Sequence, residues 1–237
     1  MNNKIISNHN QAYSDERNYR WNMAEQFEEK AILKFIEILR GIIQDNNVNI
    51  QYYRVDKIYF KKYNVCNDDW IKGSPDYLIV INIDKSKYMY IEIKLKAFEF
   101  RKTIIGGTTS AGSIITNYGC PSYYLDIEPV YMNMCKFCIN EKIVTKYFII
   151  IFVSDQLTEF RIISLNKIDL LIKKGFLDKK NNYVPLCKFG EGYGKTTYLI
   201  PKDSTTDIKA INKQQLFFEL CSDDIPETIQ KAIKRIA

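Results

Sequence analysis

Two apolar segments, 77–83 and 88–96, restrict the possible folds of this chain more than any other feature. Both are rich in Ile, Tyr and Val, which favour strands, and the polar turn 84–86 between them suits a tight antiparallel hairpin. Side chains alternate along a strand, so Glu92 and Lys94 point to the same face of the second segment. A hairpin this apolar needs a larger sheet to cover it.

The segments around the hairpin predict the rest of that sheet and its helices. Apolar residues recur at helical spacing over 23–43, after a capping-box-like Asn22 and Glu25. We predict one or two strands within 48–63, strands at 146–153 and 160–164, and helices at 130–139, 166–174 and 224–236. This order predicts an α/β protein with a mixed central β-sheet flanked by α-helices. We expect a single domain over 1–237, with an arm at 1–20, a core at 22–153 and a C-terminal elaboration at 154–237.

Composition removes several function classes. His9 is the single histidine of the 237 residues, so chemistry that needs two histidines is excluded, including zincins and paired-histidine ribonucleases. The net charge of +6 permits a polyanionic partner without requiring one. The longest apolar run, 147–153, is far shorter than the roughly 20 residues of a membrane span, and the residues after Met1 are polar. We therefore expect a soluble cytoplasmic protein with no membrane partner.

Carboxylates and a lysine are brought together by the hairpin. If it pairs without a bulge, Asp76 lies opposite about Lys94, and Glu92 shares their face. Two carboxylates can bind Mg²⁺, and the backbone carbonyl of Ile93 could supply another oxygen. Lys94 could orient the attacking water and offset charge on a phosphoryl group. This pattern favours phosphodiester hydrolysis without histidine.

A further acid comes from the helix predicted at 23–43. At about 100° per residue, Glu28 falls near the middle of the apolar stripe, whereas Glu25 lies at its edge. A carboxylate on a core-facing stripe is costly unless it is paired or binds a metal. We therefore expect Glu28 to be an additional metal ligand and a catalytic residue, with Glu25 as the reserve.

Together these residues resemble the PD-(D/E)xK nuclease superfamily, which has the restriction-endonuclease-like fold. The matching motif is Pro75-Asp76 followed by Glu92-Ile93-Lys94, after an acid-bearing helix, and the resemblance covers about 23–153. It implies a single nuclease domain with its catalytic core at 22–153. It also implies Asp76 and Glu92 as metal ligands, Lys94 as the catalytic lysine and Glu28 as the helix glutamate of many members.

The resemblance implies a Mg²⁺-dependent endonuclease of double-stranded DNA, most similar in kind to type II restriction endonucleases, with one or two Mg²⁺ ions per site. Such an enzyme is expected to be a homodimer with a cognate DNA methyltransferase as its companion. Two alternatives stay open. One is a junction resolvase, repair nuclease or viral RNA endonuclease of the same superfamily. The other is a catalytically inactive nucleic-acid-binding module.

Two further patterns carry weaker signals. Cys135 and Cys138 have the spacing of a zinc half-site, and Cys120 lies upstream, but buried free thiols are the expected alternative to structural Zn²⁺. The segment 190–196 contains three glycines and Lys195 but has the wrong register for a phosphate-binding loop. We expect it to be a flexible glycine loop, and we also expect a long loop at 106–119.

Overall fold

A six-stranded sheet forms the centre of the protein in the computed structural model, which describes residues 24–55, 69–83, 85–96, 122–126, 130–154, 156–177, 179–185 and 192–234. Its strand order is β1-β2-β3-β5-β6-β9. Neighbouring strands are antiparallel except β3 and β5, which are parallel. The predicted mixed sheet is therefore confirmed. The strands are β1 (Asn49–Arg54), β2 (Tyr77–Asn82), β3 (Ser86–Lys96), β5 (Phe148–Ser154), β6 (Phe160–Ser164) and β9 (Thr206–Asp207).

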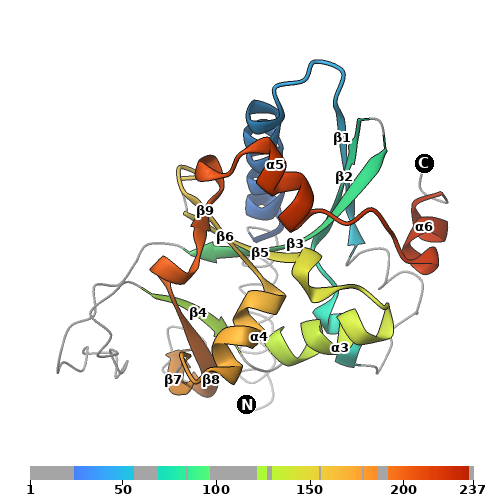
Figure 1. Cartoon of the computed structure of the whole chain (residues 1–237). Coiled ribbons are helices and arrows are strands. Elements are labelled where there is room, and N and C mark those ends of the chain that lie inside the picture. Colours follow the sequence, from blue (N-terminus) through green and yellow to red (C-terminus); the bar gives the residue numbers. More distant parts are fainter. Residues whose placement is uncertain are drawn as a thin grey trace, which may run out of the picture.

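Helices cover both faces of this sheet (Figure 1). The helix of residues 24–43 packs on one face, together with η6 (Leu216–Leu220), which continues α5 (Lys213–Gln215). The other face is covered by α3 (Met132–Asn140), α4 (Leu165–Lys173) and α6 (Glu227–Ile233). Short helical turns connect the elements: η1 (Asp69–Gly73), η3 (Thr145–Tyr147), η4 (Lys202–Ser204) and η5 (Ile208–Ala210).

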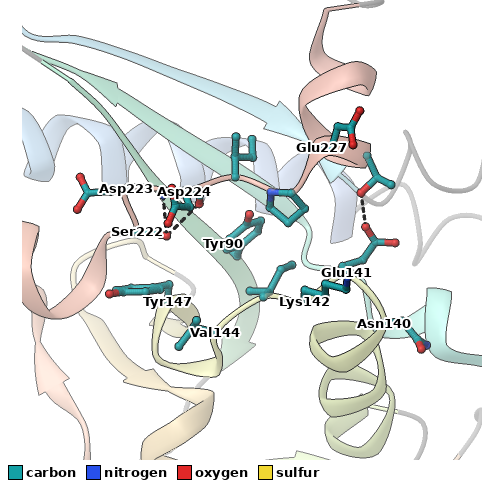
Figure 2. A pocket seen from close by; sticks show the side chains of 14 residues that line it. Tyr90, Asn140, Glu141, Lys142, Val144, Tyr147, Ser222, Asp223, Asp224 and Glu227 are labelled. Carbon is teal, nitrogen blue, oxygen red and sulfur yellow. Dashed lines mark hydrogen bonds between the residues drawn. The ribbon is translucent and has the colours of Figure 1, made fainter.

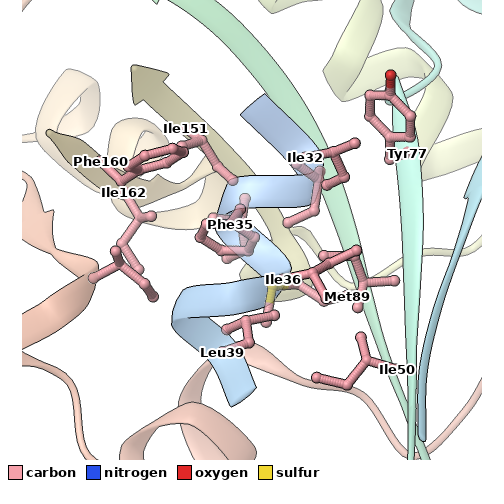
Figure 3. Close-up of a cluster of buried hydrophobic side chains, with 14 of the residues drawn as sticks. Ile32, Phe35, Ile36, Leu39, Ile50, Tyr77, Met89, Ile151, Phe160 and Ile162 are labelled. Atoms are coloured by element: carbon pink, nitrogen blue, oxygen red, sulfur yellow. The ribbon is translucent and has the colours of Figure 1, made fainter. Parts of the chain in front are cut away.

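The two hydrophobic cores explain why β2 and β5 are apolar without alternation. Every residue of β5 from Phe148 to Val153 is buried, as are the residues of β2 from Tyr77 to Ile81. A strand covered on both faces can place apolar side chains on each. Figure 3 shows Phe35 and Leu39 of the 24–43 helix against one face of the sheet. Full burial of a side chain of this size stabilises the fold by about 1.5–3 kcal/mol.

A second sheet of three strands lies beside the first, in the order β4-β8-β7. These strands are β4 (Ser122–Asp126), β7 (Lys179–Pro185) and β8 (Gly192–Pro201). Tyr198 and Ile200 of β8 belong to the same buried cluster as α3 and α4. The expected glycine loop is wrong for 192–196, because these residues pair with β7 inside β8. Their polar sequence lacks strand alternation, so the pattern gave no sign that they pair with β7.

The helix ends follow local rules. Ser164 caps α4 by accepting a hydrogen bond from the Lys167 amide at 3.2 Å, and Gly175 ends it in the left-handed region at φ 72°. The end of α3 has the same bonding pattern, but Lys142 takes the left-handed position at φ 57°. None of the helices within the described ranges is long and apolar enough to cross a membrane. The arm 1–20 and the predicted loop 106–119 lie outside the described residues.

Candidate functional site

The pairing of β2 with β3 places the two predicted carboxylates side by side. Tyr77 pairs with Ile91 and Asn82 with Ser86, so continuing the register by one residue sets Asp76 beside Glu92. The expectation that Asp76 would lie opposite Lys94 is wrong by two residues, because the turn is centred one residue earlier than expected. A shift of two residues keeps the same face of a pleated strand. Asp76 and Glu92 therefore remain neighbours.

Pro75 ends the β2–β3 ladder at this point. In the same register Pro75 would stand opposite Ile93, but proline has no N–H to donate to a neighbouring strand. The Ile93 amide donates to the carboxylate of Asp76, with Oδ2 2.7 Å from the nitrogen. The backbone carbonyl of Asp76 stays with β1, accepting the Val55 amide at 3.0 Å. Asp76 is thus held by hydrogen bonds from the end of β1 on one side and from β3 on the other.

The carbonyl oxygen of Ile93 points to the same side of β3 as its amide, toward β2. The N–H and C=O of one strand residue point toward the same neighbouring strand, and the Ile93 N–H meets Asp76. Pro75 has no N–H to give to that carbonyl. The end of the β2–β3 ladder therefore brings together the Asp76 carboxylate and the Ile93 carbonyl oxygen, with Glu92 as the adjacent residue of β3.

Glu92 is a carboxylate on a largely apolar surface. It is 7% exposed and follows the buried Tyr90 on the same face of β3. Burying a carboxylate costs free energy unless charges or hydrogen bonds compensate it. Lys94 comes two residues later in β3, paired with Phe152 of β5. The predicted Glu-Ile-Lys segment thus lies in the parallel pair at the centre of the sheet.

Glu28 lies on the 24–43 helix and reaches this end of the sheet from the face that this helix covers. Its carboxylate lies 3.3 Å from the guanidinium of Arg54, which also donates to the Tyr77 hydroxyl at 3.2 Å. The Arg54 guanidinium stands 5.0 Å from the centre of the Tyr77 ring. Burial raises the pKa of Tyr77, Arg54 opposes this rise, and the charges of Glu28 and Asp76 add to it. Both acids therefore lie close to Tyr77.

The donor set suits a hard cation. No three His, Cys, Asp or Glu side chains gather into a metal-sized group within the described ranges, so Asp76 and Glu92 would supply two carboxylates rather than three. Mg²⁺ is usually bound by one or two carboxylates and keeps several waters or substrate phosphates. The carboxylates of Asp76 and Glu92 with the Ile93 carbonyl fit this pattern. Glu28 is paired with Arg54 in this arrangement.

Sequence reasoning missed three residues that shape the site: Arg54, Tyr77 and Gly73. A Cβ atom on Gly73 would lie 2.0 Å from the Asn133 backbone carbon in α3. Only glycine permits this approach of η1, which leads directly into Pro75 and Asp76. Arg54 carried a usable signal, because it is a charged residue at the end of a segment predicted to be a strand. Nothing local marked the glycine.

The cysteines give little support to a zinc site. Cys138 is buried on α3, and burial raises the pKa values of Cys135 and Cys138. Buried thiols of this kind behave as small hydrophobic groups, the alternative expected from the sequence. Cys120, the third residue of the predicted set, lies outside the described residues.

The chain is similar to known proteins in structure rather than in sequence. No protein-family model matches the chain, and no curated protein matches it in sequence. A solved structure, described as D212, a nuclease from a fusselovirus, is similar with a TM-score of 0.42 and 16% sequence identity. The similarity covers 78% of this chain and 84% of that one.

Proposed function

We propose that this protein is a Mg²⁺-dependent nuclease that hydrolyses phosphodiester bonds in double-stranded DNA, as type II restriction endonucleases do. The observation that carries the proposal is the end of the β2–β3 ladder at Pro75, where the Asp76 carboxylate accepts the Ile93 amide and stands beside Glu92. Lys94 follows in the same strand. The order and spacing of these residues match the nuclease motif, and a histidine is not needed.

Each residue has a role in this proposal. Asp76, Glu92 and the Ile93 carbonyl would hold the cation, and Glu28 would join them as a further carboxylate. When bound, Mg²⁺ would stabilise negative charge on the phosphoryl oxygens and favour deprotonation of water. Lys94 would orient the attacking water for in-line displacement and offset the charge that develops in the transition state. The burial of Glu92 limits competing water at the carboxylates.

The proposed substrate determines the expected oligomeric state. Cutting both strands of a duplex at one position requires two sites, so we propose a homodimer. A restriction enzyme would also need a DNA methyltransferase that protects the host sequence. The cytoplasmic location expected from the sequence belongs to the same proposal.

The direct test is incubation of purified protein with plasmid DNA, genomic DNA and RNA, in Mg²⁺ or in EDTA. Asp76→Asn keeps an oxygen that can accept the Ile93 amide but removes the charge, so the fold should persist while cleavage falls at least about a hundredfold. Lys94→Met should likewise keep the fold and lower cleavage at least about a hundredfold. Asp203→Asn, at an exposed position on η4, is the matched control and should cleave normally.

The outcomes separate the alternatives. Discrete, Mg²⁺-dependent DNA fragments that disappear in both site variants would support the restriction-type proposal. Cleavage of RNA alone would replace DNA as the substrate. No cleavage of any nucleic acid, together with unchanged binding in the variants, would overturn the enzymatic proposal.

A further inference from the structure

A cavity of about 580 Å³ lies at the start of β3, on the face that carries α3 and α6. One wall is the turn after α3, residues 140–144 with Tyr147, and the other is the segment 222–228 that leads into α6. Tyr90 rises from β3 between these walls (Figure 2). The volume of the cavity is within the range of about 300–1,000 Å³ typical of small-molecule sites.

The hydroxyl of Tyr90 is the unusual feature of this cavity. Tyr90 is 1% exposed, and within the described part of the chain its hydroxyl oxygen has no hydrogen-bond partner. A buried hydroxyl without a partner costs free energy, so native proteins seldom keep one without a reason. Burial and the nearby charge of Glu141 raise the pKa of Tyr90, so its phenol stays protonated at neutral pH. It can therefore donate one hydrogen bond and accept others.

Four carboxylates line the cavity: Glu141, Asp223, Asp224 and Glu227, with Lys142 as the basic residue of the lining. Lys87 and Lys231, outside the lining, pair with Asp223 and Glu227, so Glu141 is the buried carboxylate that supplies negative charge to the cavity. Glu141 is 8% exposed, and it accepts a hydrogen bond from the Thr228 hydroxyl. A carboxylate has about four acceptor positions, so one bond from Thr228 leaves capacity for a further donor.

The remaining lining is apolar. Ile143, Val144, Ile225 and Pro226 contribute aliphatic surface, and Tyr147 contributes an aromatic ring. Apolar walls with a few convergent polar groups are the usual composition of a ligand site. A cation with an apolar stem would be attracted by the carboxylates and would pack on the apolar walls. An anion would be repelled by the carboxylates.

We propose that this cavity binds a small organic cation, a primary ammonium or guanidinium group carried on an apolar stem. Glu141 supplies the counter-charge, and the Tyr90 oxygen accepts a hydrogen bond from the cation. The stem packs on the aliphatic wall beside Pro226. This site is independent of the proposed nuclease reaction, although Tyr90 and Glu92 lie two residues apart in β3.

Calorimetric titration of the purified full chain, without nucleic acid or Mg²⁺, tests the proposal. Benzamidine, benzamide and benzoate share a shape and differ in charge, and agmatine adds a flexible guanidinium. We expect saturable binding of benzamidine or agmatine, weaker binding of benzamide and none of benzoate. Absence of saturation by both cations, or benzoate binding as tightly as benzamidine, would overturn the proposal.

Two substitutions test whether the ligand contacts Tyr90 and Glu141. Tyr90→Phe removes only the hydroxyl and should weaken cation binding about tenfold to a hundredfold, the loss expected for one hydrogen bond to a charged group. Glu141→Gln should weaken it at least as much. Tyr53→Phe in β1 and Glu219→Gln in η6 are matched controls that should bind normally.

Two further measurements distinguish a ligand-binding hydroxyl from a structural one, and this site from the nuclease site. Tyr90→Phe should leave the thermal midpoint of the empty protein unchanged or raised, because the lost hydroxyl had no partner. A lowered midpoint would mean that the hydroxyl has a structural role, and cation binding unchanged in both pocket variants would place the ligand elsewhere; either result overturns the assignment. Asp76→Asn should bind the cation normally, so failure of the nuclease proposal would leave this one standing.

Discussion

At the scale of single residues, the proposed site depends on one proline and on the aspartate that follows it. Pro75 has no amide hydrogen, so it cannot donate to the Ile93 carbonyl and continue the ladder, and the Ile93 amide donates to the side chain of Asp76. A carboxylate held by a backbone amide is already oriented before a cation arrives. Arg54 organises the other side by contacting both Glu28 and Tyr77.

Glu28 provides the first prediction at this scale. Glu28→Gln should lower the rate of DNA cleavage at least about tenfold, the size of effect seen when groups that orient metal ligands are lost. The reason is that Glu28 and its partner Arg54 flank Tyr77, next to Asp76. The measurement is the single-turnover cleavage rate, with circular dichroism to show that the fold is intact.

The matched control lies on the same helix. Glu37 pairs with Lys34 at 2.6 Å on the exposed face, so Glu37→Gln removes the same charge away from the site. Its cleavage rate should equal that of the wild type, since exposed ion pairs contribute little. Full activity in Glu28→Gln would remove Glu28 from the proposed machinery.

At the scale of elements, the close approach of η1 to α3 positions the strand end that carries Asp76. Gly73 lies so near the backbone of Asn133 that no side chain fits between them. Three residues later the chain reaches Asp76. Movement of η1 would therefore shift the carboxylate as well as weaken the packing of α3.

Substitution of this glycine gives the second prediction. Gly73→Ala should lower the free energy of unfolding by an amount at the upper end of the roughly 1–3 kcal/mol that overpacking costs, because the clash is with backbone that cannot rotate away. Urea unfolding measures the change, and cleavage activity should fall with it. Gly41→Ala is the control: its Cβ would meet nothing within 4 Å, and alanine in a helix should stabilise by about 0.5–1 kcal/mol. Equal stability of the two variants would contradict the packing argument.

At the scale of the whole molecule, a sheet covered on both faces separates two hydrophobic cores. The 24–43 helix and η6 belong to one core, and α3, α4, α6 and β8 belong to the other. The proposed site lies where β2 and β3 separate. Asp76 and Glu92 belong to the β2–β3 pair of the sheet, whereas Glu28 lies on the 24–43 helix.

The net charge of +6 leads to a prediction at this scale. If the protein binds DNA through phosphate contacts, its affinity should fall at least about tenfold between 50 and 200 mM salt, because each neutralised phosphate releases bound counterions. Fluorescence anisotropy with the Asp76→Asn variant and a labelled duplex measures this without cleavage. Affinity that does not change with salt would exclude a mainly electrostatic interface.

Local pattern was sufficient for the elements with strong periodicity. The 24–43 helix, the hairpin and the strand at Phe160–Ser164 could be predicted because their apolar residues repeat at the period of the structure that buries them. The strands β7 and β8 could not, since their polar residues have no such repeat and β8 also pairs with the distant β4. Pairing between distant segments leaves little trace in either segment alone.

The same division holds for the candidate site. The sequence by itself determined that Asp76 and Glu92 would share a face, because side chains alternate with a period of two and a register change of two residues leaves the faces unaltered. Only the tertiary structure decided that Asp76 stands beside Glu92, that Arg54 meets Glu28, and that Tyr90 has an unpartnered hydroxyl in an acidic cavity. The face on which a side chain lies is set by alternation within one strand. Strand pairing and the walls of a cavity depend on segments that meet only when the chain has folded.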